Sequence, residues 1–212
     1  MSGNGGGRSA GILRVVLATA NRDKAAEIAA IVDDVSGGRI ELVARPADVP
    51  EVDETGDTLE ENAVLKARAL MEATGLPAMA DDTGLEVDAL GGAPGVHSSR
   101  YSSEHATYDE NVAKLLAELE AAGATDPDSR RARFRTVAAA CFPGGRQVVA
   151  EGSVEGHIAP TRRGSAGFGY DPVFVPDGSE HTFAEMSAAD KHACSHRGRA
   201  VRALAVGLLS SP

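Results

Sequence analysis

The chain has 212 residues, 42% of them hydrophobic, which is enough to bury a sizeable core. Asp and Glu number 31 against 21 Lys and Arg, and the formal net charge of -10 excludes a general affinity for nucleic acids or anionic membranes. An anionic ligand would therefore need a local basic pocket or a metal ion. Cys141 and Cys194 lack metal-ligand spacing. We therefore expect two free thiols rather than a disulfide. Free thiols are typical of a reducing compartment, so the sequence predicts a cytoplasmic protein.

Residues 1–10 contain no apolar core of signal-peptide length, and no later stretch approaches a membrane span, so we expect a disordered tail followed by a globular chain. Hydrophobic patterning then predicts alternating elements: strands over 12–19, 39–44 and 77–80, and helices over 25–32 and 57–75. Thr58 with Glu61 forms a capping-box pattern, and Gly75 is a helix stop. This alternation predicts a largely parallel sheet, in which the loops carrying Asn21 and Asp82 emerge at one edge.

The second half of the chain predicts an antiparallel extension of that sheet. A Gly- and Pro-containing loop over 91–102 is where we expect a lobe boundary. The elements expected after it are a helix over 108–123, a hairpin of strands over 131–142 and 146–159, a long loop over 161–176 and a final helix over 187–209. The predicted fold class is therefore α/β, with a long mixed β-sheet flanked by helices.

Two adjacent carboxylates, Asp81 and Asp82, stand where the third strand is expected to leave the core. Side chains at strand ends project into the crevice where α/β sheets bind ligands, although the sequence Asp-Asp-Thr-Gly is also typical of a plain turn. Farther upstream, Asp53 and Glu54 precede a helix whose first turn is acidic, as the helix dipole favours. A carboxylate there could instead join Asp82 in holding Mg²⁺, which prefers oxygen ligands.

Two further stretches indicate a pocket for an anion joined to a ring. In "TANRDK", backbone N–H groups, the Asn21 amide and the Lys24 ammonium meet at a helix start and suit phosphate oxygens, unless Asn21 is only a helix cap and Lys24 is solvated. In "GFGYDP", Phe168 could stack on a planar base while Asp171 accepts from a ring N–H, unless the aromatic residues only pin the loop to the sheet.

A cluster of basic residues lies near the C-terminal end. Lys191 and Ser195 are four residues apart and share a helix face, and His196, Arg197 and Arg199 follow them. In an acidic protein this cluster is a local basic patch of the kind that an anionic ligand needs.

Taken in order, "T-x-N-x-x-K", "ETG…ENA", "ADDTGLEVDALGGAPG", "GFGYDP" and "K-x-x-x-S-H-R" closely resemble the inosine triphosphate pyrophosphatase family, also called non-canonical purine or XTP/dITP diphosphatases. The resemblance covers nearly the whole chain after the tail. It implies one two-lobed domain over 11–212 with the active-site cleft between the lobes, dependence on Mg²⁺, and a homodimer. The implied reaction converts a purine nucleoside triphosphate and water into the monophosphate and pyrophosphate.

The resemblance also implies roles for individual residues. Asp82 matches the catalytic base beside Mg²⁺, with Asp53 or Glu54 as the second metal ligand. The implied substrate contacts are the triphosphate loop of Thr19, Ala20, Asn21, Arg22, Asp23 and Lys24, then Thr83, the base-binding loop of Phe168, Gly169, Tyr170 and Asp171, and finally Lys191, His196 and Arg197. The sequence departs from common family members at Ala20, Thr83 and His97, and none of these changes removes a needed functional group.

Selection of inosine or xanthine over adenine follows from hydrogen bonding. Arg197 and His196 could donate to a 6-oxo group, whereas the 6-amino group of adenine would leave them unpaired. Two other functions use the same residues: a sensor that binds purine nucleotides without hydrolysis, and a pyrophosphatase for other modified nucleotides.

Overall fold

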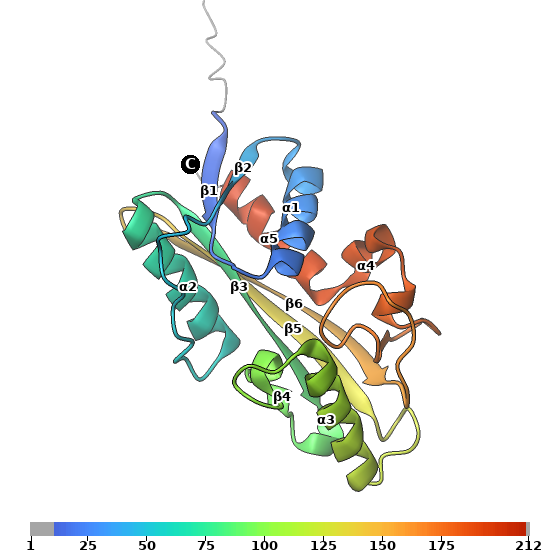
Figure 1. The fold of residues 1–212 in the computed structure, drawn as a ribbon. Helices are drawn as coiled ribbons and strands as arrows, with labels where there is room; N and C mark the ends of the chain where they lie inside the picture. Colours follow the sequence, from blue (N-terminus) through green and yellow to red (C-terminus); the bar gives the residue numbers. More distant parts are fainter. Residues whose placement is uncertain (1–10, 211–212) are drawn as a thin grey trace, which may run out of the picture.

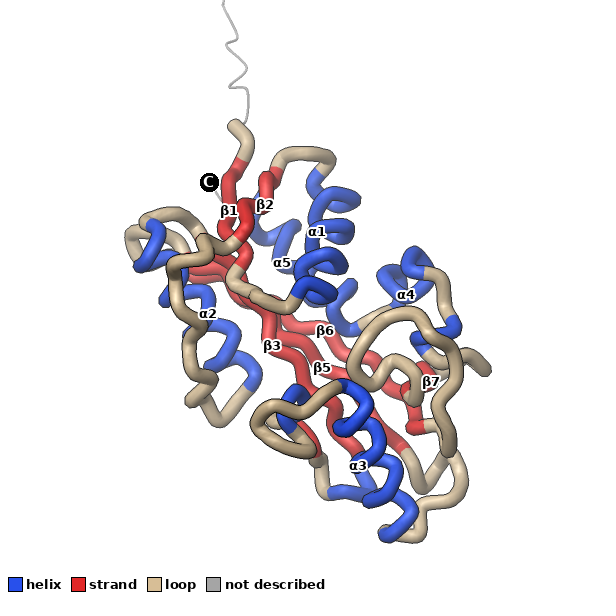
Figure 2. The backbone as a smooth tube through the Cα atoms, viewed as in Figure 1, coloured by secondary structure: helices blue, strands red, loops and turns tan. Residues whose placement is uncertain are grey.

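The computed structural model describes residues 11–210, so the tail expected over residues 1–10 lies outside them. Figure 1 shows the arrangement, and Figure 2 shows the strands as one continuous sheet with helices on both sides. The helices and strands are β1 (Leu13–Leu17), α1 (Arg22–Ser36), β2 (Ile40–Ala44), α2 (Leu59–Thr74), β3 (Ala78–Val87), β4 (Pro94–Gly95), α3 (Tyr108–Ala121), β5 (Arg131–Cys141), β6 (Gln147–Ile158), β7 (Phe174–Pro176), α4 (Ala188–Cys194) and α5 (His196–Ser210).

The sheet has the order β2-β1-β3-β5-β6-β7, and β4 pairs separately with β3. β1 is parallel to both β2 and β3, whereas the remaining pairs are antiparallel. The predicted α/β fold with a long mixed sheet is confirmed. None of the helices within residues 11–210 is both long and apolar enough to cross a membrane.

The predicted end signals of α2 work as the sequence indicates. Thr58 and Glu61 form a capping box in which each side chain accepts from the other residue's backbone N–H, and Gly75 ends the helix in a left-handed conformation with φ of 67°. Asn21 caps α1 by accepting from the backbone N–H groups of Asp23 and Lys24. These caps determine where α1 and α2 begin and where α2 ends.

Alternating residues of the central strands pack on opposite faces of the sheet. Ala138 and Ala140 of β5 belong to the core formed with α1 and α5, whereas Val137 and Ala139 pack with α2. The same alternation runs along β3, where Met79 joins the α1 and α5 core. Side chains at odd positions of this part of β3 therefore face α1 and α5, and those at even positions face α2.

The expectation that the strand ends at Asp81 and Asp82 is wrong, as is the alternative of a turn. β3 continues to Val87 because β5 pairs with it along its whole length, from Ala78 opposite Cys141 to Val87 opposite Ala132, and this pairing satisfies its backbone. The neighbour on the other side, β1, ends at Leu17 opposite Met79. The two carboxylates thus lie just beyond the end of β1, in the middle of their own strand.

Two other boundaries also differ from the prediction. The final helix is broken at Ser195, which has an extended conformation with ψ of 156° and whose hydroxyl oxygen accepts from the Gly198 backbone N–H at 3.0 Å. The long loop expected over 161–176 ends in the short strand β7, which pairs with β6. Ser is a preferred N-cap residue, so Ser195 is a local signal for a new helix that the prediction of one continuous helix did not use.

Gly152 of β6 lies where the start of α5 crosses the sheet. An added Cβ would lie 2.5 Å from the Ala200 nitrogen and closer still to the His196 carbonyl oxygen, and neither backbone atom can move aside cheaply. We expect Gly152→Ala to lower the free energy of unfolding by about 1–3 kcal/mol, measured by urea denaturation. Gly11→Ala, where an added Cβ meets nothing within 4 Å, is the control. Equal stability of the two variants would contradict this contact.

Candidate functional site

Asp81 and Asp82 point to opposite faces of β3 and contact different cations. Asp81 faces α1 and α5, where its Oδ2 lies 3.1 Å from Arg197 Nε and 3.8 Å from Lys24 Nζ. Asp82 faces α2, where its Oδ1 accepts from Lys66 Nζ at 2.8 Å. The two carboxyl groups therefore have separate environments although they are neighbours in sequence.

The environment of Asp81 strongly favours its ionised form. Burial by itself would raise the pKa of this carboxyl, but the charges of Lys24, Arg197 and Lys66 outweigh burial and hold the pKa well below its usual range. Its side chain is only 1% exposed. At neutral pH Asp81 is thus a charged anchor for the surrounding cations and a poor proton acceptor.

The environment of Asp82 has the opposite effect. Burial, with repulsion from Glu54, raises the pKa of Asp82 even though Lys66 opposes the shift. Lys66 Nζ lies 2.8 Å from both Asp82 Oδ1 and Glu54 Oε1, and Arg100 donates to Glu54 Oε2 at 3.1 Å. A carboxylate of raised basicity beside a pocket is suited to accept a proton.

The two candidate metal ligands upstream of α2 differ in position. Glu54 shares the Lys66 ammonium with Asp82, whereas Asp53 is exposed. Within residues 11–210, no group of three or more His, Cys, Asp or Glu side chains is placed to hold a metal by itself. Two carboxylates facing one pocket fit Mg²⁺, which commonly binds one or two carboxylates together with substrate phosphates. The geometry favours Glu54 over Asp53 as the partner of Asp82.

The loop before α1 contains the helix cap expected as one alternative from the sequence. Asn21 is the helix cap, and Thr19 Oγ1 accepts from the Asn21 backbone N–H at 3.1 Å. Lys24, however, is not solvated, because its side chain is 21% exposed and points toward Asp81. Arg22 and Asp23 are exposed on the outer side of this turn.

Two adjoining pockets contain most of the predicted site residues. The charged pocket is lined by residues that include Thr19, Ala20, Asn21, Lys24, Asp53, Glu54, Lys66, Asp81, Asp82, Thr83 and Arg100. The aromatic pocket is lined by Asn21, Lys24, Thr83, Ser98, Ser99, Tyr108, Asn111, Phe134, Phe168, Gly169, Tyr170, Asp171, His196 and Arg197. Asn21, Lys24, Thr83 and Ser99 line both. Of the predicted substrate contacts, Arg22, Asp23 and Lys191 line neither.

The loop containing Phe168 is pinned in place by its polar neighbours. Asp171 Oδ2 accepts from the Phe168 backbone N–H at 2.8 Å and from Lys191 Nζ at 2.7 Å, and Tyr170 donates its hydroxyl proton to the Ser98 carbonyl at 2.9 Å. Tyr170 and Asp171 are buried, whereas Phe168 is half-buried. The pinning role foreseen for the loop thus falls to Tyr170 and Asp171, and the Phe168 ring lines the pocket.

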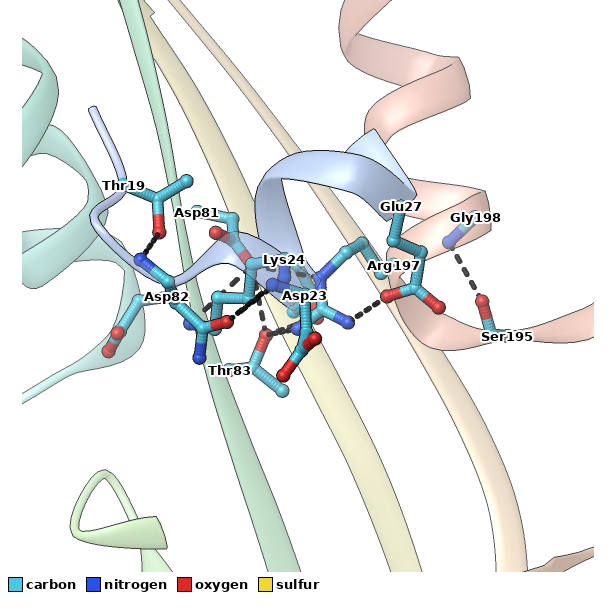
Figure 3. A network of polar contacts seen from close by, with 12 residues as sticks. Thr19, Asp23, Lys24, Glu27, Asp81, Asp82, Thr83, Ser195, Arg197 and Gly198 are labelled. Carbon is cyan, nitrogen blue, oxygen red and sulfur yellow. Dashed lines mark hydrogen bonds and ion pairs between the residues drawn. The ribbon is translucent and has the colours of Figure 1, made fainter. Parts of the chain in front are cut away.

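Arg197 connects α5 to both α1 and β3. Its guanidinium contacts Glu27 and Asp81 and donates to Thr83 Oγ1 at 3.1 Å (Figure 3). Glu27 also accepts from Lys191 at 2.9 Å. Although burial by itself would lower the pKa of Arg197, these carboxylates raise it, so the guanidinium stays charged.

His196, the neighbouring predicted residue, is neutral. Burial, together with the charges of Arg197 and Lys191, lowers the pKa of His196 well below its usual value. Its ring stacks on Phe134 with centroids 4.4 Å apart and an interplanar angle of 16°. The aromatic pocket therefore contains a neutral imidazole beside a charged guanidinium.

Lys66 and Glu27 were missed in the analysis of the sequence. Lys66 lies four residues after Asn62, whose amide is 3.5 Å from Asp82, and Glu27 lies three residues after Lys24. Both spacings place the pair on one helix face. That signal was available, but it becomes informative only when the face is known to meet β3.

The fold and the site define an α/β protein in which a charged pocket adjoins an aromatic one. The model of the Ham1 family matches residues 15–206. The dITP/XTP pyrophosphatase of Nitratidesulfovibrio vulgaris is 51% identical over 90% of this chain and 93% of its own length, and that of Geobacter sulfurreducens is 48% identical over 90% and 94%. The solved HAM1 protein from Coxiella burnetii is 41% identical, with a TM-score of 0.83 over 94% of this chain and 100% of that chain.

The chain belongs to the Ham1 family, which confirms the family resemblance stated from the motifs.

Removal of the Asp81 charge should destabilise the protein in a pH-dependent way. At pH 7 we expect Asp81→Asn to lower the free energy of unfolding by about 3–5 kcal/mol. The reason is that Arg197 and Lys24 lose the charge of the carboxylate that they both contact. A pKa below the unfolded value of about 3.9 means that this stabilisation is present above about pH 4 and is lost as the pH falls toward the folded-state value. Urea denaturation across pH 3–7 should therefore show that the wild type and Asp81→Asn become more similar in free energy of unfolding below about pH 4.

The control for this prediction is Asp33→Asn, an exposed aspartate of α1. Its effect should stay within about 0.5 kcal/mol at every pH. A difference between wild type and Asp81→Asn that grows as the pH falls would contradict the assignment of Asp81 as an ionised anchor.

Proposed function

We propose that this protein hydrolyses the non-canonical purine nucleoside triphosphates dITP, ITP and XTP to the monophosphate and pyrophosphate. The observation that carries this proposal is the junction of the charged and aromatic pockets through Asn21, Lys24 and Thr83. A purine nucleotide is a planar ring joined to a polyanion, so it matches two such pockets in sequence. The names of the dITP/XTP pyrophosphatase relatives support the same substrate class.

In this proposal the charged pocket binds the triphosphate. Lys24 and the backbone N–H groups at the start of α1 would contact phosphate oxygens, and Lys66 would add a second cation. Glu54 and Asp82 would hold Mg²⁺, which when bound supplies positive charge that offsets the phosphates. Positioning and charge neutralisation are the main contributions that phosphoryl transfer requires from a protein.

Asp82 would orient the attacking water and accept its proton. The oxygen of this water forms a bond to the α- or β-phosphorus as the bond from that phosphorus to the oxygen bridging the α- and β-phosphates breaks, and both routes give the monophosphate and pyrophosphate. Because burial and Glu54 raise the pKa of Asp82, its carboxylate is a stronger base than an exposed aspartate. Asp81 cannot take this role, since three cations hold it ionised and it contacts Arg197 and Lys24.

Base selection would depend on Arg197 and His196. Among the residues described, Arg197 donates to Glu27, Asp81 and Thr83, which uses three of the five N–H donors of a guanidinium. The remaining donors and the neutral His196 ring suit a 6-oxo group, whereas a 6-amino group would leave them unpaired. Arg197→Ala would also leave Glu27 with Lys191 and Asp81 with Lys24 as their remaining cationic partners, so the substitution changes folding as well as selectivity.

A purine-nucleotide sensor would use the same two pockets without cleavage. The pair of Glu54 and Asp82 favours hydrolysis, because a protein that only binds gains little from carboxylates beside phosphates. A pyrophosphatase for other modified nucleotides is separated from the proposal by a panel of substrates. The homodimer, the cytoplasmic location and the division of one domain into two lobes stay predictions.

Substrate and product are tested together. Purified protein should release pyrophosphate from dITP, ITP and XTP with Mg²⁺, and should be much slower with GTP or ATP and without the metal. Orthophosphate as the first product would refute the proposed reaction, and binding without any hydrolysis would establish the sensor.

The role of Asp82 predicts a loss of turnover. Asp82→Asn keeps the size of the side chain but removes its charge and basicity, and we expect turnover of dITP to fall by about a hundredfold or more. Initial rates at saturating dITP and Mg²⁺ measure this loss. Near-normal turnover of the folded variant would remove Asp82 from the role of general base.

The choice between Glu54 and Asp53 predicts different metal dependence. Glu54→Gln should raise the Mg²⁺ concentration needed for half-maximal activity by about tenfold, because it removes a charged ligand. The matched variant Asp53→Asn should have a smaller effect, since Asp53 is exposed and does not share Lys66 with Asp82. The reverse order would assign the metal to Asp53.

A further inference from the structure

Tyr108 lines the aromatic pocket from a helix for which the sequence motifs indicate no function. It is the first residue of α3, and 41% of it is exposed. The other large hydrophobic residues exposed within residues 11–210, Ile12, Val149 and Val206, do not line this pocket. An exposed aromatic ring at the wall of a pocket is a candidate for ligand contact.

Two contacts hold Tyr108 across the pocket. Its ring centroid lies 5.9 Å from that of Phe168, with an interplanar angle of 38°, and its hydroxyl oxygen accepts from Asn21 Nδ2 at 2.8 Å. The hydroxyl also lies 3.5 Å from Asp23 Oδ2. Tyr108 thus joins the loop that carries Phe168 to the loop at the start of α1.

The first turn of α3 is attached to the Phe168 side of the pocket by a second contact. Arg162, in the loop that leads to Phe168, forms an ion pair with the Asp109 carboxylate and donates to the Asp109 carbonyl oxygen at 2.6 Å. Figure 1 shows α3 beside this loop. The position of Tyr108 is therefore determined by α3, Arg162 and Asn21 together.

We propose that Tyr108 is a base-contacting residue, whose ring covers a purine bound against Phe168. This inference rests on the proposed function and names a further residue of the same site. The tilted contact between Tyr108 and Phe168 buries less ring surface than a planar base stacked on either ring would. An exposed side chain at the first position of a helix can turn to admit that base.

Lys191 and Arg197 lie 5.0 and 5.3 Å from the centre of the Phe168 ring. These cations already contact Phe168 through cation–π attraction, which holds the ring in place. Tyr108, by contrast, contacts the Phe168 ring with its own ring, and Asn21 and Asp23 with its hydroxyl.

The test compares Tyr108→Leu, which removes the ring, with Tyr108→Phe, which removes only the hydroxyl. Calorimetric titration with dIMP and, separately, with inorganic pyrophosphate distinguishes base from phosphate contact. Tyr108→Leu should weaken dIMP binding by about five- to a hundredfold, the span of base–aromatic stacking, and leave pyrophosphate binding unchanged. Tyr108→Phe should retain dIMP affinity. Glu120→Ala, an exposed change at the far end of α3, is the matched control.

Fluorescence supplies a readout that a merely structural role would not alter. The chain has three tyrosines and no tryptophan, so stacking of a base on Tyr108 should quench tyrosine emission directly. The quenching by dIMP should be reduced in Tyr108→Leu and retained in Glu120→Ala, and pyrophosphate should cause none.

Three outcomes would overturn the inference. They are unchanged dIMP affinity in Tyr108→Leu, an equal loss of dIMP and pyrophosphate binding, and a loss in Tyr108→Phe as large as in Tyr108→Leu. If the wild-type protein binds dIMP but does not cleave dITP, the proposed activity fails, and the same titrations still decide whether Tyr108 contacts the base.

Discussion

The organisation of the site depends on the alternation of side chains along β3. Because successive residues of a strand face opposite sides of the sheet, Asp81 is directed to α1 and α5, and Asp82 to α2. Three cations keep Asp81 ionised, while burial and Glu54 raise the pKa of Asp82. Two chemically identical neighbours therefore have different roles, one as an anchor for cations and the other as a candidate base.

Asp81 connects that strand to a buried network of charges. Arg197 contacts Asp81 and Glu27, and Glu27 also accepts from Lys191, which in turn holds Asp171. Such pairs add little net stability when complete, but the loss of one partner leaves a buried charge that is costly. The network thus enforces the relative positions of α1, α4, α5 and the Phe168 loop, and with them the walls of the aromatic pocket.

Much of this arrangement was predictable from local signals. The strands, the caps at Asn21, Thr58 and Gly75, and the hairpin of β5 and β6 depend on patterns within a few residues. The end of β3 was not predictable in this way, since an antiparallel partner more than 50 residues away extends it through Asp-Asp-Thr-Gly. The break at Ser195, by contrast, has a local signal, because Ser favours the cap of a helix over its interior.

The sequence by itself determined the α/β class and the family, because short motifs and periodic patterns depend on local chemistry. Only the tertiary structure decided that Glu54 rather than Asp53 shares Lys66 with Asp82, and that Tyr108 stands beside Phe168. These contacts join α2 to β3 and α3 to a loop 60 residues farther along the chain. Their distances depend on how helices pack on the sheet, which no spacing within one segment specifies.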